Sequence, residues 1–457
     1  MDITHHPIYK DVLKVINAQL QQTNRDISIT LHTPTANIEI INLGNLDIHT
    51  DYVGCMTDLI FLKVLISSTD YARHIYPNRN NLEATMTISA LGSIGNKQVG
   101  AKNLYSRRYK ALFLVNDNEQ IGLAQANMVK QSALDIIPPV DLNLQLSNRA
   151  AEALDYMTLN HDVFQNIDNE QLLKYVYASS SASVSINGKP LIDIIDIVTP
   201  DNTTKRDIVI PHGTHVTAMT YLAQHKFGGV YNAGIGSYVY TNQDGKNVWS
   251  VYPKYNTNRF NQQIKKLVIY VLPTDRFAGI EKTFRVSGDT VYIVCTGNKK
   301  YFDDAEAGYG IGGVGFMMTN ANSIHTKGVE VKPSGPYANP ARINYNVATL
   351  NKADGNPHIP MAANNVSSNP YVQYSEVLAR TGGNLLLEWD NGDAMLLHPC
   401  MPCNIVFFNE QSVDVVDGVL HGVDTTYGSM GFGVWNKIYK PHIVLHVFSK
   451  KNLKNRI

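Results

Sequence analysis

The sequence is poor in charged residues, and neither sign of charge is in excess. Only 17% of the 457 residues are charged, and 39 basic side chains balance 39 acidic ones. Proteins that bind duplex nucleic acid generally carry a basic surplus, so this balance argues against sequence-specific binding of nucleic acid. A neutral surface favours association over solubility, and the 25 tyrosines are of a type enriched at protein interfaces. The composition therefore indicates a protein that works inside an assembly.

Cysteine and long apolar runs are also scarce. The four cysteines (Cys55, Cys295, Cys400 and Cys403) are too few for a disulfide scaffold and indicate reduced thiols in a cytoplasm. The first residues, MDITHHPIYKDVLKV, lack the basic and apolar regions of a secretory signal, so we expect none. No stretch reaches about 18 uninterrupted apolar residues, so we expect neither a membrane span nor a membrane partner.

Alternating apolar residues predict strands over most of the chain. In ISITLH, Ile27, Ile29 and Leu31 share one face, and VDLNLQL repeats the pattern at 140–146. Further β-rich runs are MTDLIFLKVLIS, ATMTISAL, KALFLVND, KKLVIYVL and TVYIVCTG. Near the C-terminal end follow NLLLEW, NIVFF, VDVVDGVLHGV and HIVLHVF. This last set, at about 372–450, has the spacing of a small antiparallel barrel.

Helical patterns occur only in the middle of the chain. SNRAAEALDYMTL follows Ser147, a favourable N-cap, and NIDNEQLLKYVYASS predicts a second helix. A third helix is predicted from about Gly213 to Lys226, ended by a glycine pair. Residues 319–370 are rich in proline and asparagine and have little periodicity, which predicts a long loop or arm that a partner orders.

The third helix coincides with IPHGTHVTAMTYL, in which HGTHV looks like the histidine motif of subtilisin-like serine proteases. Such an enzyme needs Asp, His and Ser in that chain order, each within its own motif. Ser429 lacks the residues that flank the catalytic serine, and the alternating α/β pattern of the fold is missing. Four upstream carboxylates also lack the Asp-Thr-Gly form: Asp193, Asp196, Asp201 and Asp207. We predict instead that Thr214 or His212 caps the helix.

Metal-binding residues are too few at either candidate position. His212 and His215 lie three residues apart, and HPCMPC offers His398, Cys400 and Cys403. Tetrahedral zinc takes four such ligands, and no second cysteine pair completes the set. Prolines flank the Cys-x-x-Cys spacing and NIVFF follows it, so we predict a tight turn that leads into a strand, without bound metal.

A glycine-rich stretch and an acidic stretch follow each other near residue 305. GYGIGGVG has the Gly-x-Gly-x-x-Gly spacing at Gly308, Gly310 and Gly313, but the strand before it and the helix after it are missing. We predict a flexible loop that binds no dinucleotide. YFDDAEAG clusters Asp303, Asp304 and Glu306 without the spacing of a calcium loop, which predicts a solvated turn. No cofactor is expected.

Four stretches together resemble the baseplate hub proteins of contractile-tailed bacteriophages. They are DLIFLKVLISSTDYARHIYPNRNNLEATMTI (58–88), YLAQHKFGGVYNAGIGSYVYTNQDGKNVWSVYPKYNTNRF (221–260), GIEKTFRVSGDTVYIVCTG (279–297) and LLLEWDNGDAMLLHPCMPCNIVFF (385–408). Where hub proteins usually have a Pro-Gly-Met turn, this chain has Pro399, Cys400 and Met401. The resemblance covers about half of the chain.

The resemblance implies an α+β, β-rich fold with two antiparallel β-barrel hub domains and an inserted mixed α/β region. The implied division is a first barrel at 1–146, the mixed insertion at 147–318, an extended arm at 319–371 and a second barrel at 372–457. It also implies a non-enzymatic role: three copies form a ring that joins the sixfold tail tube to the threefold central spike. The implied partners are further copies of the chain, the tail tube protein, the central spike protein and other baseplate proteins. Such a protein is assembled in the host cytoplasm and works in the virion.

Two other hypotheses remain open at this point. The chain could be a different β-rich virion component, such as a fibre-attachment or capsid-decorating protein, which would lack the duplicated barrel. It could also be a hydrolase with His212 or His215 as base, in which case a fluorophosphonate would label Ser429 or another serine.

Overall fold

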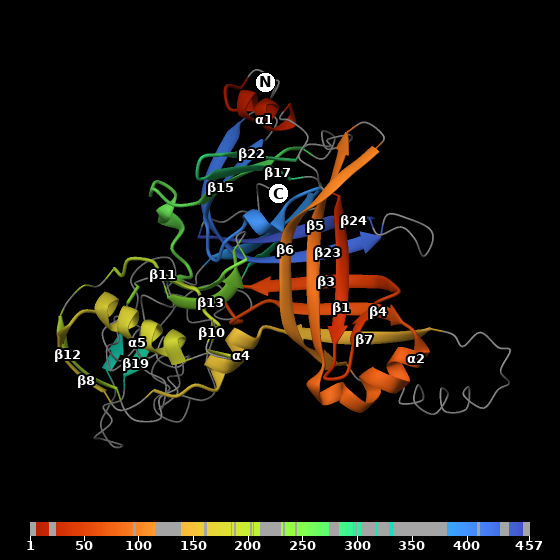
Figure 1. Cartoon of the computed structure of the whole chain (residues 1–457). Helices are drawn as coiled ribbons and strands as arrows, with labels where there is room; N and C mark the ends of the chain where they lie inside the picture. The colour runs from red at the N-terminus through yellow and green to blue at the C-terminus, as the bar shows by residue number, and fades with distance from the viewer. Residues whose placement is uncertain are drawn as a thin grey trace.

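The chain folds into a β-rich α+β structure that contains one 15-stranded sheet and several small sheets. In Figure 1 the orange N-terminal strands lie to the right, the blue C-terminal strands lie in the upper middle beside them, and a yellow mixed α/β part lies to the lower left. Among the described residues, no helix combines the length and hydropathy that a membrane crossing requires. The computed structural model describes residues 6–17, 24–94, 97–114, 139–159, 162–183, 185–186, 189–201, 203, 205–210, 230–231, 234–242, 245–273, 283–295, 297, 299–303, 316–318, 329–331, 382–408, 412–429 and 438–450.

Strands of the N-terminal third pair with two C-terminal strands in a closed ring. The order is β3-β4-β7-β6-β5-β1-β24-β23, and β23 pairs again with β3. A short strand, β2 (Asn37–Glu39), pairs with β1 outside this ring. The ring strands are β1 (Arg25–His32), β3 (Asn42–Asp51), β4 (Leu59–Ile66), β5 (Glu83–Ile94), β6 (Lys97–Phe113), β7 (Val140–Ser147), β23 (Val413–Ser429) and β24 (Ile438–Ser449).

The ring surrounds the first core. Ile27, Ile29 and Leu31 all point into it from β1, which confirms the face predicted from the alternation. Alternate residues of β7 do the same, and all four predicted positions of that strand are buried. Between β4 and β5, α2 (Ser68–Asp70), η2 (Tyr71–Ile75) and η3 (Tyr76–Asn81) cover one end and bury Ile75 in this core.

The C-terminal strands also belong to a second, strongly curved part of the large sheet. Its order is β18-β21-β24-β23-β22-β15-β17-β16, so β23 and β24 are shared with the ring. The added strands are β15 (Lys266–Val271), β16 (Phe284–Ser287), β17 (Thr290–Val294), β18 (Lys299–Asp303), β21 (Gly383–Asp390) and β22 (Pro402–Phe408); η7 (Ala394–Leu396) lies between β21 and β22. A second core fills its concave side, with Trp389, Ile405 and Leu445 among its fully buried members.

The second sheet is mixed, and the expectation of a purely antiparallel barrel there is wrong. β15 pairs in parallel with both β17 and β22, with Ile269 opposite Ile293 and Ile405. The strand spacing within 372–450 indicated hairpins only, whereas the parallel neighbour of β22, which is β15, lies more than a hundred positions upstream. Such pairing depends on tertiary packing and leaves no local turn signal.

The N-terminal helix, α1 (Tyr9–Ile16), packs on the convex side of the second sheet. Val12 and Val15 are buried there against the outward-facing Tyr270, Val294 and Phe408. The helix lies at the top of the molecule in Figure 1, and the strands that it covers are distant from it in the sequence.

The mixed α/β part has its own core around Trp249, whose ring lies 4.0 Å from that of Tyr177. Both predicted helices are present, although Asn148, and not Ser147, caps the first by accepting a hydrogen bond from Ala150 N. Ser147 instead completes strand β7. The elements are α4 (Arg149–Asp155), β8 (Asp162–Ile167), α5 (Asn169–Ser183), β9 (Ser185–Ile186), β10 (Lys189–Pro190), β11 (Ile194–Ile197), β12 (Arg206–Ile210), β13 (Ile235–Thr241), β14 (Asn247–Pro253) and η4 (Thr257–Arg259).

Several sequence predictions fall outside the described residues. These are the third helix with its HGTHV motif at 211–229, the glycine-rich stretch at 308–313, and most of the predicted arm at 319–371. Within the arm, β20 (Val329–Val331) is described and pairs with β19 (Phe316–Met318).

Candidate functional site

The carboxylates considered for a protease bind backbone and hydroxyl groups within the mixed part. Asp193 accepts a hydrogen bond from Asn247 N at 2.8 Å, and Asp207 accepts one from Asn166 N at 2.9 Å. Asp196 accepts a longer one, 3.4 Å, from Ser250 Oγ. Ser429 ends β23 in the large sheet, while both motif histidines lie outside the described residues. Asp193 and Asp207 thus connect paired strands, Asp193 at β11 and β14 and Asp207 at β12 and β8.

The HPCMPC stretch forms the predicted turn into a strand. Cys400 takes a positive φ of 49°, Met401 N donates to His398 O at 3.3 Å, and β22 begins at Pro402. Cys400 and Cys403 are buried free thiols, and burial raises the pKa of both thiols far above the usual value. Among the described residues, no group of three or more His, Cys, Asp or Glu side chains is placed to hold a metal ion.

The His398 side chain bridges two other polar groups and not the cysteines. Its Nε2 lies 2.8 Å from Lys265 Nζ, and its Nδ1 lies 3.2 Å from the Tyr240 hydroxyl. Burial, and then the charge of Lys265, lowers the pKa of His398 to about 4, so the ring is neutral at pH 7. A lysine ammonium can only donate, so Nε2 accepts and Nδ1 donates its proton to Tyr240.

Sequence reasoning missed a polar cluster buried where the ring, the second sheet and the mixed part meet. Asp58 accepts hydrogen bonds from Tyr238 Oη at 2.7 Å and Thr50 Oγ1 at 2.8 Å. Burial raises the pKa of Asp58, against the effect of these hydrogen bonds. The guanidinium of Arg107 lies over the Tyr105 ring, and within the described part of the chain its buried Nε and Nη2 have no hydrogen-bond partner.

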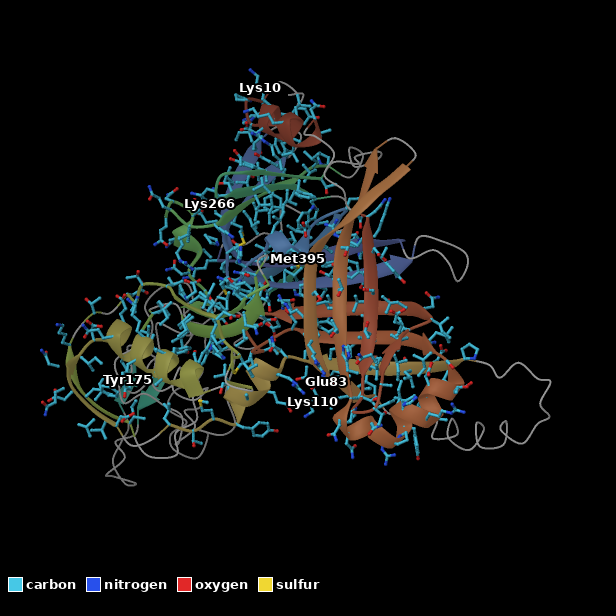
Figure 2. All side chains as sticks on the ribbon, in the orientation of Figure 1. Lys10, Glu83, Lys110, Tyr175, Lys266 and Met395 are labelled. Carbon is cyan, nitrogen blue, oxygen red and sulfur yellow. The ribbon has the colours of Figure 1, made fainter. Side chains whose placement is uncertain are left out.

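A small cavity of about 80 Å³ lies between these groups and the η7 segment, where Met395 is placed at the centre of the molecule (Figure 2). This volume exceeds what one ordered water requires, and the surrounding hydroxyl, carboxylate and guanidinium groups are suitable partners for water. The only sequence signal was Asp58 itself, an acidic residue directly before the apolar run of β4. The hydrogen bond of Tyr238 to Asp58 joins the mixed part to the ring.

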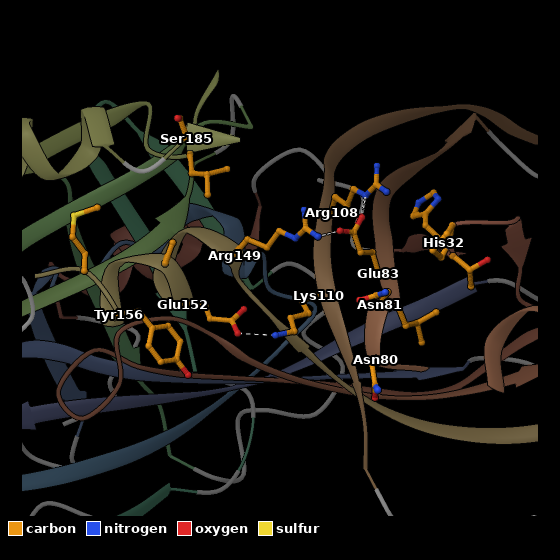
Figure 3. Close-up of a pocket in the computed structure, with 16 residues that line it drawn as sticks. His32, Asn80, Asn81, Glu83, Arg108, Lys110, Arg149, Glu152, Tyr156 and Ser185 are labelled. Carbon is orange, nitrogen blue, oxygen red and sulfur yellow. Dashed lines mark hydrogen bonds and ion pairs between the residues drawn. The ribbon is translucent and has the colours of Figure 1, made fainter. Parts of the chain in front are cut away.

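A second polar region lies on the surface between the ring and α4 and is shown in Figure 3. There Glu83, at the start of β5 and only 13% exposed, forms ion pairs with both Arg108 and Arg149. Beside it, Lys110 Nζ lies 2.8 Å from the carboxylate of Glu152. The two acidic and three basic side chains therefore fasten α4 to strands β5 and β6.

The groove along these ion pairs is open and has a volume of about 850 Å³. Tyr156, at the end of α4, lies at its mouth and is 77% exposed. An exposed tyrosine beside paired charges is typical of a protein contact surface. The described part of this groove thus offers an exposed surface on which three basic side chains pair with two acidic ones.

No protein-family model and no curated protein matches the chain. Among solved structures, a tail protein from Neisseria meningitidis MC58 is 11% identical, with a TM-score of 0.45, over 93% of this chain and 97% of its own. The 43 kDa tail protein of prophage MuSo2 from Shewanella oneidensis is 8% identical, with a TM-score of 0.46 and the same two coverages.

A third similar structure is an E. coli component of the type VI secretion system, which is itself described as similar to tail proteins of bacteriophage T4. It is 8% identical, with a TM-score of 0.40, over 92% of this chain and 77% of its own. The structure neighbours are thus phage tail and baseplate proteins and type VI secretion proteins.

Proposed function

We propose that this chain is a structural protein of a contractile phage tail and forms the baseplate hub ring between tail tube and central spike. The proposal assigns the chain no enzymatic activity and no cofactor. Its partners are further copies of the chain, the tail tube protein, the central spike protein and other baseplate proteins.

The observation that carries the proposal is the duplicated arrangement of β structure around two cores. The ring encloses the first core, the curved sheet encloses the second, and the strands β23 and β24 run through both. We propose that these are the two barrel domains of a hub, with the mixed part as the insertion and 319–371 as the arm. Strands β15 to β17 then complete the second barrel from within the 147–318 range.

Two of the stretches that resemble hub proteins lie one in each β part. Residues 58–88 form β4, the helical turns and β5 of the ring, and 385–408 form β21 and β22 of the second sheet. The other two stretches include β13 with β14 and β16 with β17. The resemblance thus concerns the framework of the fold and is not limited to one loop.

Two barrels per subunit would solve a symmetry mismatch. Three subunits with two similar barrels each present six similar positions to a sixfold tube, while the subunits themselves keep threefold symmetry toward a spike. The low charge and the tyrosine content suit the large heterologous interfaces that such a ring requires.

The oligomeric state tests this proposal. Sedimentation velocity at micromolar concentration should give a trimer, and electron-microscopy averages of the particle should show a ring with six similar densities around its axis. A monomer that also fails to associate with a contractile-tail tube protein would overturn the proposal.

A fluorophosphonate should leave every serine unlabelled, and labelling of Ser429 would instead support the hydrolase.

A further inference from the structure

A cleft of about 650 Å³ lies between the mixed part and the second sheet, and we name it the Arg259 cleft. Its floor is one face of the β11–β14–β13 sheet, on which Ile194, Asp196 and Ser250 lie. The opposite face of that sheet, with Trp249 and Val251, is buried in the core of the mixed part. The facing wall is formed by residues 259–265 and by the 398–402 turn.

Arg259 is a buried cation whose charge is not neutralised by an ion pair. Its side chain is at the end of η4 and is only 6% exposed, yet it lines the cleft. Its Nε donates to Gln262 Oε1 at 3.3 Å, and among the described residues its guanidinium forms no ion pair. The carboxylates of Asp196 and Asp201 act on its charge electrostatically without pairing with it. A guanidinium keeps its proton when buried, so an unpaired arginine in such a position is costly unless an anion reaches it.

The other charges of the cleft leave a positive excess. Lys265 is exposed and its Nζ contacts the neutral ring of His398, which provides no counter-charge. Asp196 is the one carboxylate among the described lining residues, and it accepts only the long hydrogen bond from Ser250. The residues that line the cleft thus carry two cations and one anion, while Asp201 acts on Arg259 from outside the lining.

The shape of the cleft suits an extended polypeptide. Strand β11 is the edge strand of its sheet, and Ile194 and Ile264 add apolar surface beside the charged groups. Asp193 N donates toward β14, so the N–H of the next residue, Ile194, is directed to the edge at which no other described strand pairs. Edge strands of this kind accept extended segments through backbone hydrogen bonds, and neighbouring pockets select the side chains.

We propose that the Arg259 cleft binds an extended segment of a partner protein that carries an acidic side chain, with its carboxylate paired to Arg259. Lys265 contributes to the attraction from the rim, and the edge of β11 aligns the backbone of the segment. This inference does not depend on the proposed role in a tail, because it follows from the charges and shape of the cleft alone.

A fluorescent peptide tests the carboxylate. The probe is an acetylated and amidated peptide of alternating valine and threonine with one central aspartate, and its matched control has asparagine at the centre. Fluorescence anisotropy with the full chain should show that the aspartate peptide binds about tenfold more tightly than the asparagine peptide. Equal binding of the two peptides, or binding of neither, would overturn the proposal.

Two substitutions then locate the effect. Arg259→Gln should remove the preference for aspartate, while Arg285→Gln, on β16 outside the cleft, should leave it unchanged. A preference that survives in a folded Arg259→Gln variant excludes Arg259 as the carboxylate partner.

Asp196→Asn removes the exposed carboxylate that the cleft itself carries, and it does not disturb a core. This variant should bind the aspartate peptide several-fold more tightly than the unchanged chain does. An Asp196→Asn variant without this gain contradicts the charge argument even if Arg259→Gln fails to fold.

Discussion

The indole Nε1 of Trp389 donates a hydrogen bond to the hydroxyl of Thr283 at 3.1 Å, and this hydroxyl donates to Asp390 O at 2.8 Å. Trp389 is on β21, whereas Thr283 directly precedes β16, at the far end of the second sheet. The Phe284 ring meets the Trp389 ring edge-on, with centroids 5.6 Å apart. Side chains thus join two strands that share no ladder hydrogen bonds, and they bring the sheet back toward itself over the second core.

Thr283→Val should weaken this closure. Valine keeps the shape of threonine but leaves the buried Trp389 Nε1 without an acceptor, so the free energy of unfolding should fall by about 1–3 kcal/mol. Urea unfolding followed by circular dichroism measures the change. Thr87→Val, which removes an exposed hydrogen bond to Ser106, is the matched control and should cost less than about 0.5 kcal/mol. Equal costs for the two variants would show that the indole hydrogen bond does not close the sheet.

The local pattern of the sequence was enough to predict many strands of the large sheet and two helices. The alternation around Ile29 and along β7 correctly identified the buried faces, because burial on one side of a strand leaves a period of two in the sequence. The turn at Cys400 was also predicted correctly, since its flanking prolines and the apolar run after it are local signals.

What the sequence could not provide is the pairing of distant segments. Nothing local to Ile269 indicates that it lies between Ile293 and Ile405, and the closure at Trp389 depends on a threonine far upstream. The Arg259 cleft and the Asp58 cluster have the same origin, because each brings together side chains from separate parts of the chain. Only three-dimensional packing makes Arg259 a buried cation that no described carboxylate pairs with.

Asp424 should couple the three strands at the point where the ring meets the second sheet. It lies on β23, 2.9 Å from His49 Nδ1 on β3 and 2.7 Å from His446 Nε2 on β24. Burial alone would raise its pKa, but the hydrogen bonds from both histidines outweigh burial and lower it. A carboxylate with a lowered pKa stabilises the fold above its ordinary pKa, and this contribution is lost as the pH falls through the folded value.

Asp424→Asn should therefore reduce the free energy of unfolding at pH 7 by about 0.5–1 kcal/mol, a modest amount because the side chain is partly exposed. Urea titrations of both proteins at a series of pH values should show that the difference narrows as the pH is lowered into the acidic range. A difference that stays constant over this series would contradict the assignment to the ionised carboxylate.

His421 should make the protein sensitive to acid. Its ring stacks on Phe448 with centroids 4.8 Å apart, and its Nε2 is 2.9 Å from Lys254 O. Burial lowers the pKa of His421 to about 4, whereas in an unfolded chain it is about 6.5. Between these values the unfolded state binds a proton that the folded state does not, so stability is complete above about pH 6.5 and falls toward pH 4.

The slope of this loss identifies the residue. One such proton contributes at most about 1.4 kcal/mol per pH unit, and His398 acts in the same direction. In His421→Gln the amide can still donate to Lys254 O. Between pH 6.5 and 4.5, the free energy of unfolding of this variant, measured in urea, should fall less steeply with decreasing pH, by the contribution of one proton. An unchanged slope would mean that His421 titrates equally in both states.

Glu83→Gln should loosen the attachment of α4 to the ring. The change leaves Arg108 and Arg149 without their shared carboxylate at a position that is mostly buried, with an expected cost of about 1–2 kcal/mol. Hydrogen exchange should become faster in α4 than elsewhere. Asp141→Asn, which breaks the exposed pair with Lys63, is the control and should change stability by less than about 0.5 kcal/mol. If both substitutions reduce stability by a similar amount, Glu83 does not attach α4 to the ring.

The reactivity of the four thiols should separate Cys55 from the others. Alkylation requires an accessible thiolate, and Cys400 and Cys403 are both buried with pKa values that burial raises. Iodoacetamide at pH 8, followed by mass spectrometry, should label partly exposed Cys55 in the folded chain and the three buried cysteines only in urea. Cys55→Ser should then leave the folded chain unlabelled. Rapid labelling of Cys400 in the folded chain would contradict the buried turn. If Cys400 and Cys403 resist labelling in urea until a reductant is added, they form a disulfide and are not the free thiols of this structure.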